Sequence, residues 1–262
     1  MSSTEFANHT SILTTGQTHR VWSLLVTVFG DLSDGADSWI SGATLNKITA
    51  AIGIKPEATR VALHRLRKDK WIESKRHGRT STYALTLTGQ EQSDAARPRI
   101  YAQANAVTDC QLVIVEPGTT SPISNPATLA ITPDLLLSSD FDGFADALLL
   151  DVPTPLPQWM RRRVCGAALI HETRNTHSAF VKLNTALQTH PITAPLEIAV
   201  LRVLIVHSWR RIVLRTPNLP DNVFPDDWLG ADCRKLSVTL LAALPRPALS
   251  QLKDAAAHEQ AA

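Results

Sequence analysis

The segment from Lys55 to Thr88 constrains the fold of this chain more than any other part of the sequence. It reads KPEATRVALHRLRKDKWIESKRHGRTSTYALTLT, a basic helical pattern followed by two strand patterns around Gly78. Pro56 stands in the first helical turn, where its missing N–H costs nothing, and Gly78 supplies the tip of a hairpin. A basic helix followed at once by a basic hairpin is typical of a recognition helix and its β-wing.

A second helix is expected just upstream, at about 43–51. It would end at Gly53, which takes the left-handed conformation of a helix end without strain. The tight turn between this helix and the helix that begins at Pro56 predicts a helix-turn-helix. A further helix is expected at about 17–29, whereas residues 1 to about 15 are polar and expected to be loose.

On a helical wheel the basic helix has two faces. Its buried face is expected to hold Ala58, Val61, Ala62 and Leu66, with Leu63 at the edge. Its outward face would carry Glu57, Arg60, His64, Arg67 and Lys68. Thr59 is expected to meet a phosphate beside the free N–H groups of the first turn, and Arg65 to form an ion pair. The predicted DNA contacts are Thr59, Arg60, His64 and Arg67 on the helix, with Arg76, Arg79 and Thr80 at the wing.

Positive charge is concentrated in this segment. Between Lys55 and Arg79, nine lysines and arginines stand against three acids, whereas the whole chain has a net charge of only +2. The remainder is therefore net acidic, and the basic end is predicted to meet a polyanion such as double-stranded DNA. The alternatives are a solvated basic surface without a partner, and an edge hairpin whose charges only prevent aggregation.

Several other classes of protein are not favoured by the sequence. Cys110, Cys165 and Cys233 are far apart and form no zinc-binding pattern, which fits a reducing cytoplasm. No apolar run reaches the length of a membrane span, and no signal peptide is recognisable. His171 and His177 are six residues apart, which does not place two rings on one helix face, so no metal site is expected. Because phosphate-loop, dinucleotide and serine-hydrolase motifs are also missing, we expect no enzyme and no cofactor.

Downstream of residue 97 the pattern changes twice. Pro98 is expected to interrupt or end a linker helix, and apolar runs within 110–118, 128–139 and 146–153 predict short strands. Helical patterns then follow at about 160–171, 175–189, 194–215 and 232–244. We therefore expect three domains, at 1–97, 98–160 and 161–262.

Two separate segments resemble the PaaX-type transcriptional regulators, the phenylacetic acid degradation repressors. The first resemblance rests on Arg60, Val61, Ala62, Leu63, Arg65, Leu66, Trp71, Gly78, Arg79, Tyr83, Leu87, Thr88 and Gly89, with Arg99 to Tyr101 downstream. The second rests on His207, Arg210, Arg211, Leu214, Arg215, Pro217, Leu219, Pro220, Pro225, Asp227, Trp228 and Gly230.

The resemblance implies a mainly helical α+β fold with an N-terminal winged helix-turn-helix, a central ferredoxin-like dimerisation domain and a C-terminal helical domain. It also implies a homodimeric repressor on a palindromic operator at phenylacetate-catabolism genes, released by phenylacetyl-coenzyme A. Residues 105–160 are short and lack the family's aromatic stretch, which favours as an alternative a constitutive regulator with a degenerate sensor. A third reading is an acyl-thioester enzyme that uses Cys165 or His207.

An anionic, aromatic effector such as an acyl-coenzyme A would find arginines for its phosphates and a Trp for its ring. The candidates are His207, Trp209, Arg210 and Arg211. In the alternative, His207 and Trp209 belong to the core, and the two arginines pair with Asp226 and Asp227. The arginines at 161–163 are a second phosphate candidate or a solvated helix start.

Overall fold

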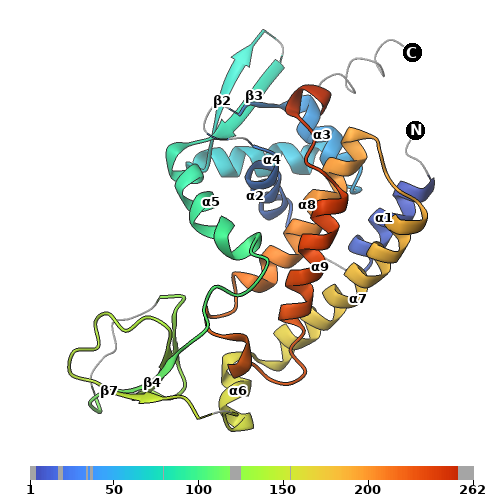
Figure 1. Ribbon diagram of the computed structural model, residues 1–262. Coiled ribbons are helices and arrows are strands. Elements are labelled where there is room, and N and C mark those ends of the chain that lie inside the picture. The colour runs from blue at the N-terminus through green and yellow to red at the C-terminus, as the bar shows by residue number, and fades with distance from the viewer. Residues whose placement is uncertain are drawn as a thin grey trace.

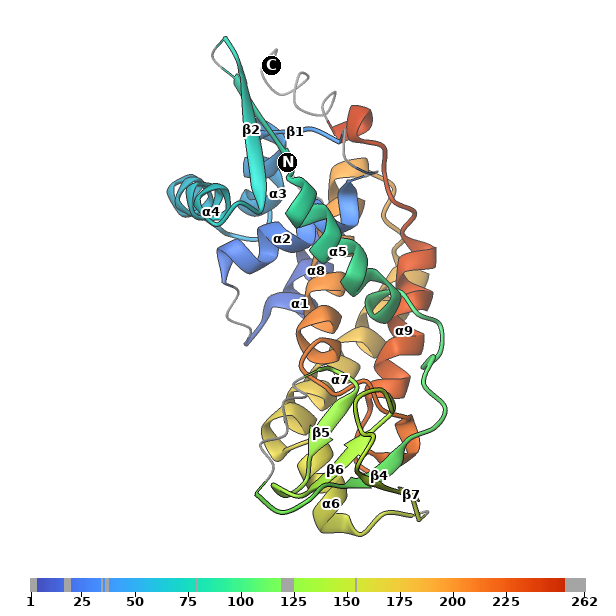
Figure 2. The same cartoon turned by 90° about the vertical axis from the view of Figure 1, so that its left-hand side faces the viewer.

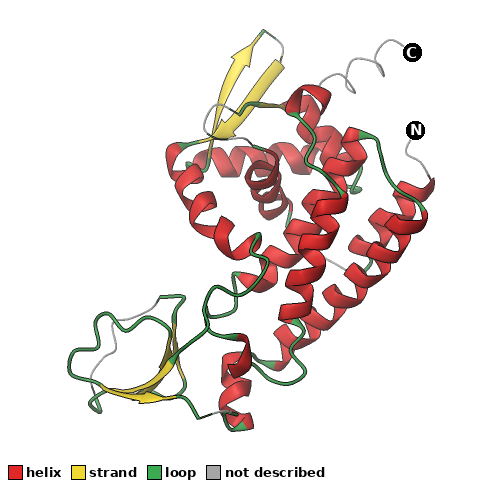
Figure 3. Ribbon diagram, in the orientation of Figure 1, coloured by secondary structure: helices red, strands yellow, loops and turns green. Residues whose placement is uncertain are grey.

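The computed structural model describes residues 4–16, 20–33, 35, 38–78, 80–118, 125–153 and 155–252. The protein is a mainly helical α+β molecule with two small antiparallel sheets, as expected from the sequence. Figures 1 and 2 show an elongated body of helices with one sheet at each end, and Figure 3 separates helices from strands by colour. Within the described ranges, no helix combines the length and the apolar composition needed to cross a bilayer.

The basic segment folds as two helices joined by a tight turn. Helix α3 (Gly42–Ala50) begins at Ser41, whose side chain accepts a hydrogen bond from the N–H of Thr44 at 3.0 Å. The chain then turns through Gly53, which has a φ of 80°, and α4 (Pro56–Lys68) begins with its proline in the first turn. The helix, turn and helix predicted from the sequence are therefore present.

One face of α4 is buried, but it is not quite the face expected from the wheel. Thr59 is fully buried and donates a hydrogen bond from its hydroxyl to that of Thr49 at 2.9 Å, next to buried Leu63 and Leu66. The buried face of α4 is therefore centred on Thr59, Leu63 and Leu66, and not on the side that includes Val61. Val61, which we expected inside, is 70% exposed.

A hairpin follows α4 directly (Figure 1). Strands β2 (Ile72–His77) and β3 (Thr80–Leu85) are antiparallel, and the short β1 (Ile40–Ser41) pairs with β3 in the order β1-β3-β2. Gly78 has a φ of 60° at the tip, as the turn requires. Trp71 immediately precedes β2, and its N–H donates to the carbonyl of Leu66 at 2.9 Å.

The second sheet lies at the opposite end of the molecule (Figure 2). Its strands are β4 (Gln111–Ile114), β5 (Thr128–Ala130), β6 (Leu135–Ser138) and β7 (Leu148–Asp151). All neighbours are antiparallel, in the order β5-β6-β4-β7, which is the strand order of a ferredoxin-like sheet. The described residues between these strands, however, contain no crossover helix, so the expected ferredoxin-like domain is represented here only by its sheet.

The C-terminal part is helical, as predicted. It contains α6 (Gln158–Val164), α7 (Ala167–Thr189), α8 (Pro195–Val213) and α9 (Gly230–Ala243), with a short 3₁₀ turn at Asp221–Val223. The break between the first two helices falls at Cys165 and Gly166, not near residue 173 as expected. The proline-rich stretch before α9 is otherwise a loop, as its turn residues indicated.

One hydrophobic core connects the two ends of the chain. Helix α8 is buried on almost all sides and packs against α2 (Val21–Leu32), α5 (Leu87–Ile100), α7 and α9. Helix α1 (Thr4–Thr14), a segment we expected to be loose, also packs on α7 and α8 through Phe6 and Leu13. The core therefore continues across residue 97, where we expected a domain boundary. Pro98 lies inside α5, which ends two residues later.

Candidate functional site

The outward face of α4 carries a row of basic side chains. Arg60, His64, Arg67 and Lys68 are all exposed, with Glu57 beside them in the first turn. The structure therefore places Arg60, His64 and Arg67 on the accessible face, as the wheel predicted. Arg67 donates from Nη1 to the Ser74 hydroxyl at 3.3 Å, which links the helix to the first strand of the hairpin.

Thr59 cannot contact a phosphate as proposed from the sequence. Its side chain is 0% exposed, and its hydroxyl is engaged by Thr49 of α3. The prediction was wrong because a threonine near a helix start can equally well satisfy its hydroxyl within a core. Thr59 instead holds α4 against α3 through its hydrogen bond to Thr49.

The hairpin adds a second basic element beside α4. Arg76 is exposed and donates from Nε to the carbonyl of Gly78 at 3.1 Å, and Thr80 is exposed on the opposite strand. Arg79, the remaining predicted wing residue, lies outside the described residues. Lys75 places its ammonium group 4.0 Å from the ring centroid of Trp39, so its charge is held near the base of the hairpin.

Arg65 differs from its neighbours on α4. It pairs with Asp69 one turn later at 3.6 Å, and its guanidinium lies 5.1 Å from the Trp22 ring centroid. The expected ion pair is therefore present, although both side chains remain more than half exposed. Arg65 fastens α4 to α2, whereas Arg60 and His64 remain available to a partner.

Three of the four predicted effector residues, His207, Arg210 and Arg211, line a cavity, whereas Trp209 lies in the core. A cavity of about 420 Å³ is lined by Arg20, Trp22, Ser23, His207, Arg210, Arg211, Leu214 and Arg215. His207 is 1% exposed, and its Nδ1 lies 3.1 Å from the hydroxyl of Thr27. Arg210 donates to the same hydroxyl at 3.0 Å and to the carbonyl of Ser23 at 3.2 Å. Burial lowers the pKa of Arg210 from its ordinary value, because the charged form loses hydration there.

Trp209 faces away from this cavity. It is 1% exposed, and its indole N–H donates to the carbonyl of Ile100 at 3.1 Å. The role proposed for it in effector binding is therefore wrong, and the alternative of a core residue is right. The aromatic wall of the cavity is instead Trp22, which sequence reasoning missed together with Arg20.

The arginines of α8 do not pair with the acids we expected. Arg211 forms an ion pair with Glu172 at 3.3 Å, and Arg215 contacts the same carboxylate. Asp226 instead pairs with Arg161, which also donates to the carbonyl of Phe224. Asp227 pairs with Arg162 at 3.1 Å. The run at 161–163 is therefore largely neutralised by neighbouring acids.

The residues proposed for thioester chemistry lack the environment it requires. Cys165 is 1% exposed, and burial, with a smaller contribution from Asp227, raises the pKa of its thiol to about 12. A nucleophilic cysteine needs the opposite shift and an accessible sulfur. His207 is committed to Thr27 in the interior. Neither residue is therefore placed to carry out the thioester chemistry considered from the sequence.

Comparison with known proteins relates both ends of the chain to one family. The family model described as PaaX-like protein matches residues 20–89, and the model for the PaaX-like protein C-terminal domain matches residues 168–254. The transcriptional repressor PaaX of Escherichia coli (strain K12) is 25% identical over 268 residues, covering 88% of this chain and 83% of that protein.

A solved structure shares the fold. The uncharacterized protein Rv0674 from Mycobacterium tuberculosis superposes with a TM-score of 0.50 over 90% of this chain and 97% of that chain. Its sequence identity is 17%, so the likeness concerns the fold alone. The four-stranded sheet lies between the two family matches and outside both.

Proposed function

Because this chain belongs to the PaaX-type family of transcriptional regulators, we propose that it is a DNA-binding repressor with a winged helix-turn-helix. Helix α4 enters the major groove, and the β2–β3 hairpin lies along the adjacent backbone. The observation that carries the proposal is the exposed row on α4, joined to the hairpin by the hydrogen bond from Arg67 to Ser74. The protein acts on chromosomal DNA in the cytoplasm.

Within this proposal the side chains of α4 have separate roles. Arg60 reads a base, since a guanidinium can donate two hydrogen bonds to guanine, and His64 contacts a base edge or phosphate. Arg67 and Arg76 position the protein on phosphates, together with the predicted wing contacts Arg79 and Thr80. Val61 is an apolar side chain on the same exposed face, where it suits contact with a thymine methyl group.

A two-fold homodimer would place two such units on a palindromic operator. Strand β7 supports this part of the proposal, because it is an edge strand with three exposed leucines, Leu148, Leu149 and Leu150. Substitution Leu148→Lys would put a charge on that edge. Light scattering should then report a monomer where the unaltered protein is a dimer, and an unchanged dimer would place the interface elsewhere.

The proposed effector is an acyl-coenzyme A, with phenylacetyl-coenzyme A as the first candidate, and the proposed targets are phenylacetate-catabolism genes. His207, Arg210 and Arg211 supply the polar part of its site. A ligand releases the repressor only by the difference in its affinity for the two states of the protein. The effector must therefore bind the form that is not on DNA more tightly.

Capture of fragmented genomic DNA at physiological salt, with and without phenylacetyl-coenzyme A, tests the function. A palindrome beside aromatic-acid genes, lost when the thioester is added, is the expected result. Enrichment that ignores the thioester would favour a constitutive regulator, and no enrichment by folded dimer would reject specific DNA binding.

On the captured sequence, Arg60→Ala should weaken binding by about 1–3 kcal/mol. Arg163→Ala, an exposed arginine on α6 at the other end of the molecule, is the matched control and should change nothing. Unchanged affinity in a folded Arg60→Ala protein would remove Arg60 from base reading.

A further inference from the structure

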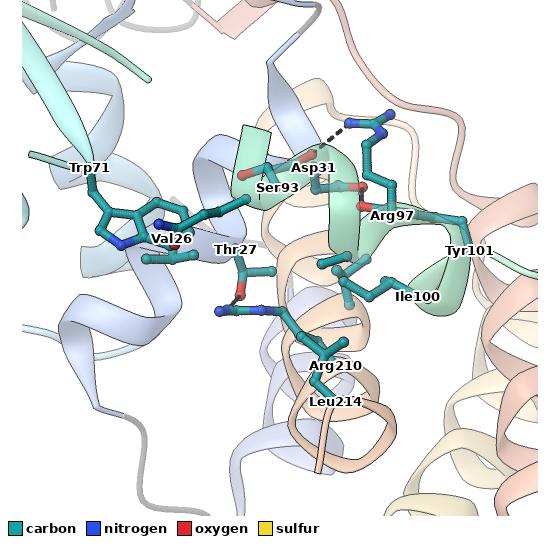
Figure 4. Close-up of a pocket in the computed structure, with 14 residues that line it drawn as sticks. Val26, Thr27, Asp31, Trp71, Ser93, Arg97, Ile100, Tyr101, Arg210 and Leu214 are labelled. Atoms are coloured by element: carbon teal, nitrogen blue, oxygen red, sulfur yellow. Dashed lines mark hydrogen bonds between the residues drawn. The ribbon is translucent and has the colours of Figure 1, made fainter. Parts of the chain in front are cut away.

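Two cavities lie next to each other along the seam between α2 and α8. They share Arg210 and Leu214 as lining residues, and each continues along the same two helices. One is the arginine-lined cavity of about 420 Å³, and the other has a volume of about 220 Å³ (Figure 4). Together they fall in the range of roughly 300–1,000 Å³ that is usual for small-molecule sites.

The smaller cavity is mainly apolar. Its walls include Val26, Ala96, Ile100 and Val206, with Trp71 at the end nearest the hairpin (Figure 4). A cavity of about 150 Å³ lined by apolar side chains can hold a benzene molecule, so this one has room for an aromatic ring with a short linker.

Two polar side chains that line this apolar cavity already have partners. The Tyr101 hydroxyl donates to Asp31 at 2.9 Å, and Arg97 donates to the carbonyl of Gly30 at 3.0 Å. A ligand would therefore meet a mostly apolar surface there and would need no additional polar group in this part of the site.

The larger cavity has an excess of positive charge. Among the described residues, the guanidinium of Arg210 bonds only neutral acceptors, although it is partly buried. Arg211 and Arg215 share the single carboxylate of Glu172, and Arg20 is exposed at the rim. A desolvated cation beside three further arginines is a favourable site for phosphate groups.

We propose that the two cavities form one site for an amphipathic anion, with an aromatic acyl group in the apolar cavity and a phosphorylated tail on the arginines. The proposal rests on the function proposed above, and it assigns the place and the orientation of the effector. The acyl group lies toward the DNA-binding end of the molecule, against Trp71. The tail lies toward the beginning of α2, between Arg20 and Arg215.

Trp71 gives this site a direct connection to the DNA-binding elements. It lies between α4 and β2, its N–H donates to Leu66 in α4, and its carbonyl accepts from the N–H of Thr86 at 3.1 Å. Lys70, just before it, has a φ of 57°, which is a strained value for a residue with a side chain. A ligand ring that packs against Trp71 therefore touches the residue whose backbone joins α4 to the hairpin, and through it we expect the ligand to change binding to DNA.

Titration calorimetry on the full-length protein without DNA tests the site independently of its function on DNA. Phenylacetyl-coenzyme A is compared with coenzyme A, which lacks the acyl group. The complete thioester should bind at least about tenfold more tightly than coenzyme A, because only the thioester fills both cavities.

Two substitutions address the two ends of the site. Ala96→Leu narrows the apolar cavity, and it should reduce thioester affinity to that of coenzyme A while leaving coenzyme A unaffected. Arg20→Ala removes a surface charge without disturbing the core, and it should weaken both ligands by the same factor, about three- to tenfold. Arg163→Ala is the control for loss of one exposed arginine and should bind as the unaltered protein does.

The outcomes separate the site from the function. If the thioester binds and folded Ala96→Leu and Arg20→Ala proteins both bind it normally, the effector lies elsewhere and the assignment is wrong. No thioester binding at about 1 mM would overturn the assignment too, while operator binding would still stand as evidence for a DNA-binding regulator. If the assignment is correct, the thioester should weaken operator binding by the unaltered protein and have little effect on Ala96→Leu.

Discussion

Breaking the buried ion pair between Asp31 and Arg202 should be among the most destabilising single changes in this protein. The Asp31 side chain is 1% exposed and accepts hydrogen bonds from Arg202 Nε at 3.1 Å and Nη2 at 2.9 Å. Its Oδ1 also accepts from the Tyr101 hydroxyl. Arg202 additionally donates to the carbonyls of Leu241 and Leu244, so the pair connects α2 and α8 with the end of α9.

Asp31→Asn keeps the shape of the side chain but leaves the buried guanidinium without a counter-charge. Removing one partner of such a pair typically costs about 3–5 kcal/mol, because the remaining charge stays desolvated. Tyr101→Phe keeps the pair and removes one hydrogen bond to a charged group, which should cost only about 1.5–3 kcal/mol. Total stability of a native protein is about 5–15 kcal/mol, so the first change should be obvious in any unfolding curve.

Urea unfolding followed by circular dichroism and by tryptophan fluorescence measures these differences, provided that the two transitions coincide. Asp69→Asn, which breaks an exposed pair with Arg65, is the matched control and should cost less than about 1 kcal/mol. If Asp31→Asn costs no more than that control, the carboxylate is not an essential counter-charge, and the argument from burial fails. The double substitution Asp31→Leu with Arg202→Met should recover part of the loss, since it removes both charges together.

Three further predictions concern other parts of the structure. Gly89→Ala would bring a Cβ to 2.2 Å from the Trp71 carbonyl oxygen, so the melting temperature should fall markedly in thermal unfolding. An unaltered melting temperature would mean that the first turn of α5 does not lie against Trp71 as described. Thr59→Val keeps the side-chain volume but removes the hydroxyl that donates to Thr49, so the free energy of unfolding should fall by about 1 kcal/mol. The dependence of DNA affinity on salt concentration should stay unchanged, and a weaker dependence would mean that Thr59 contacts a phosphate after all. Burial raises the pKa of the Cys233 thiol to about 12. Between about pH 9 and pH 12 the thiol ionises in the unfolded chain but stays protonated in the folded protein, so stability should decrease as pH rises through this range. In urea unfolding at several pH values, a Cys233→Ala protein should show less of that decrease.

The parts of the fold that sequence reasoning predicted correctly are determined locally. The turn at Gly53, the start of α4 at Pro56 and the hairpin tip at Gly78 each depend on the backbone preference of a single residue. The outward position of Arg60 and Arg67 follows from helical periodicity alone. These features could be predicted because no distant part of the chain changes them.

The features that sequence reasoning missed depend on distant partners. The buried face of α1 includes His9 and Thr10 with its apolar residues, so no clear apolar stripe marks it, and only packing on α7 and α8 makes it a stable helix. Nothing in the sequence connects Arg20 with Arg210, which are brought together by the packing of α2 on α8. A core Trp209 and a lining Trp22 cannot be told apart without that packing.

Sharing α8 between the two ends of the chain has a consequence for how the protein is made and how it can evolve. The part of the apolar surface of α2 that packs on α8 remains uncovered until α8 has been synthesised more than 160 residues later, so the N-terminal part cannot complete its fold early on the ribosome. A fragment that stops after α5 should be poorly folded and prone to aggregate. For the same reason, this DNA-binding end could not be exchanged as a ready-made module between regulators; it would have to be inherited together with the helix that completes its interior.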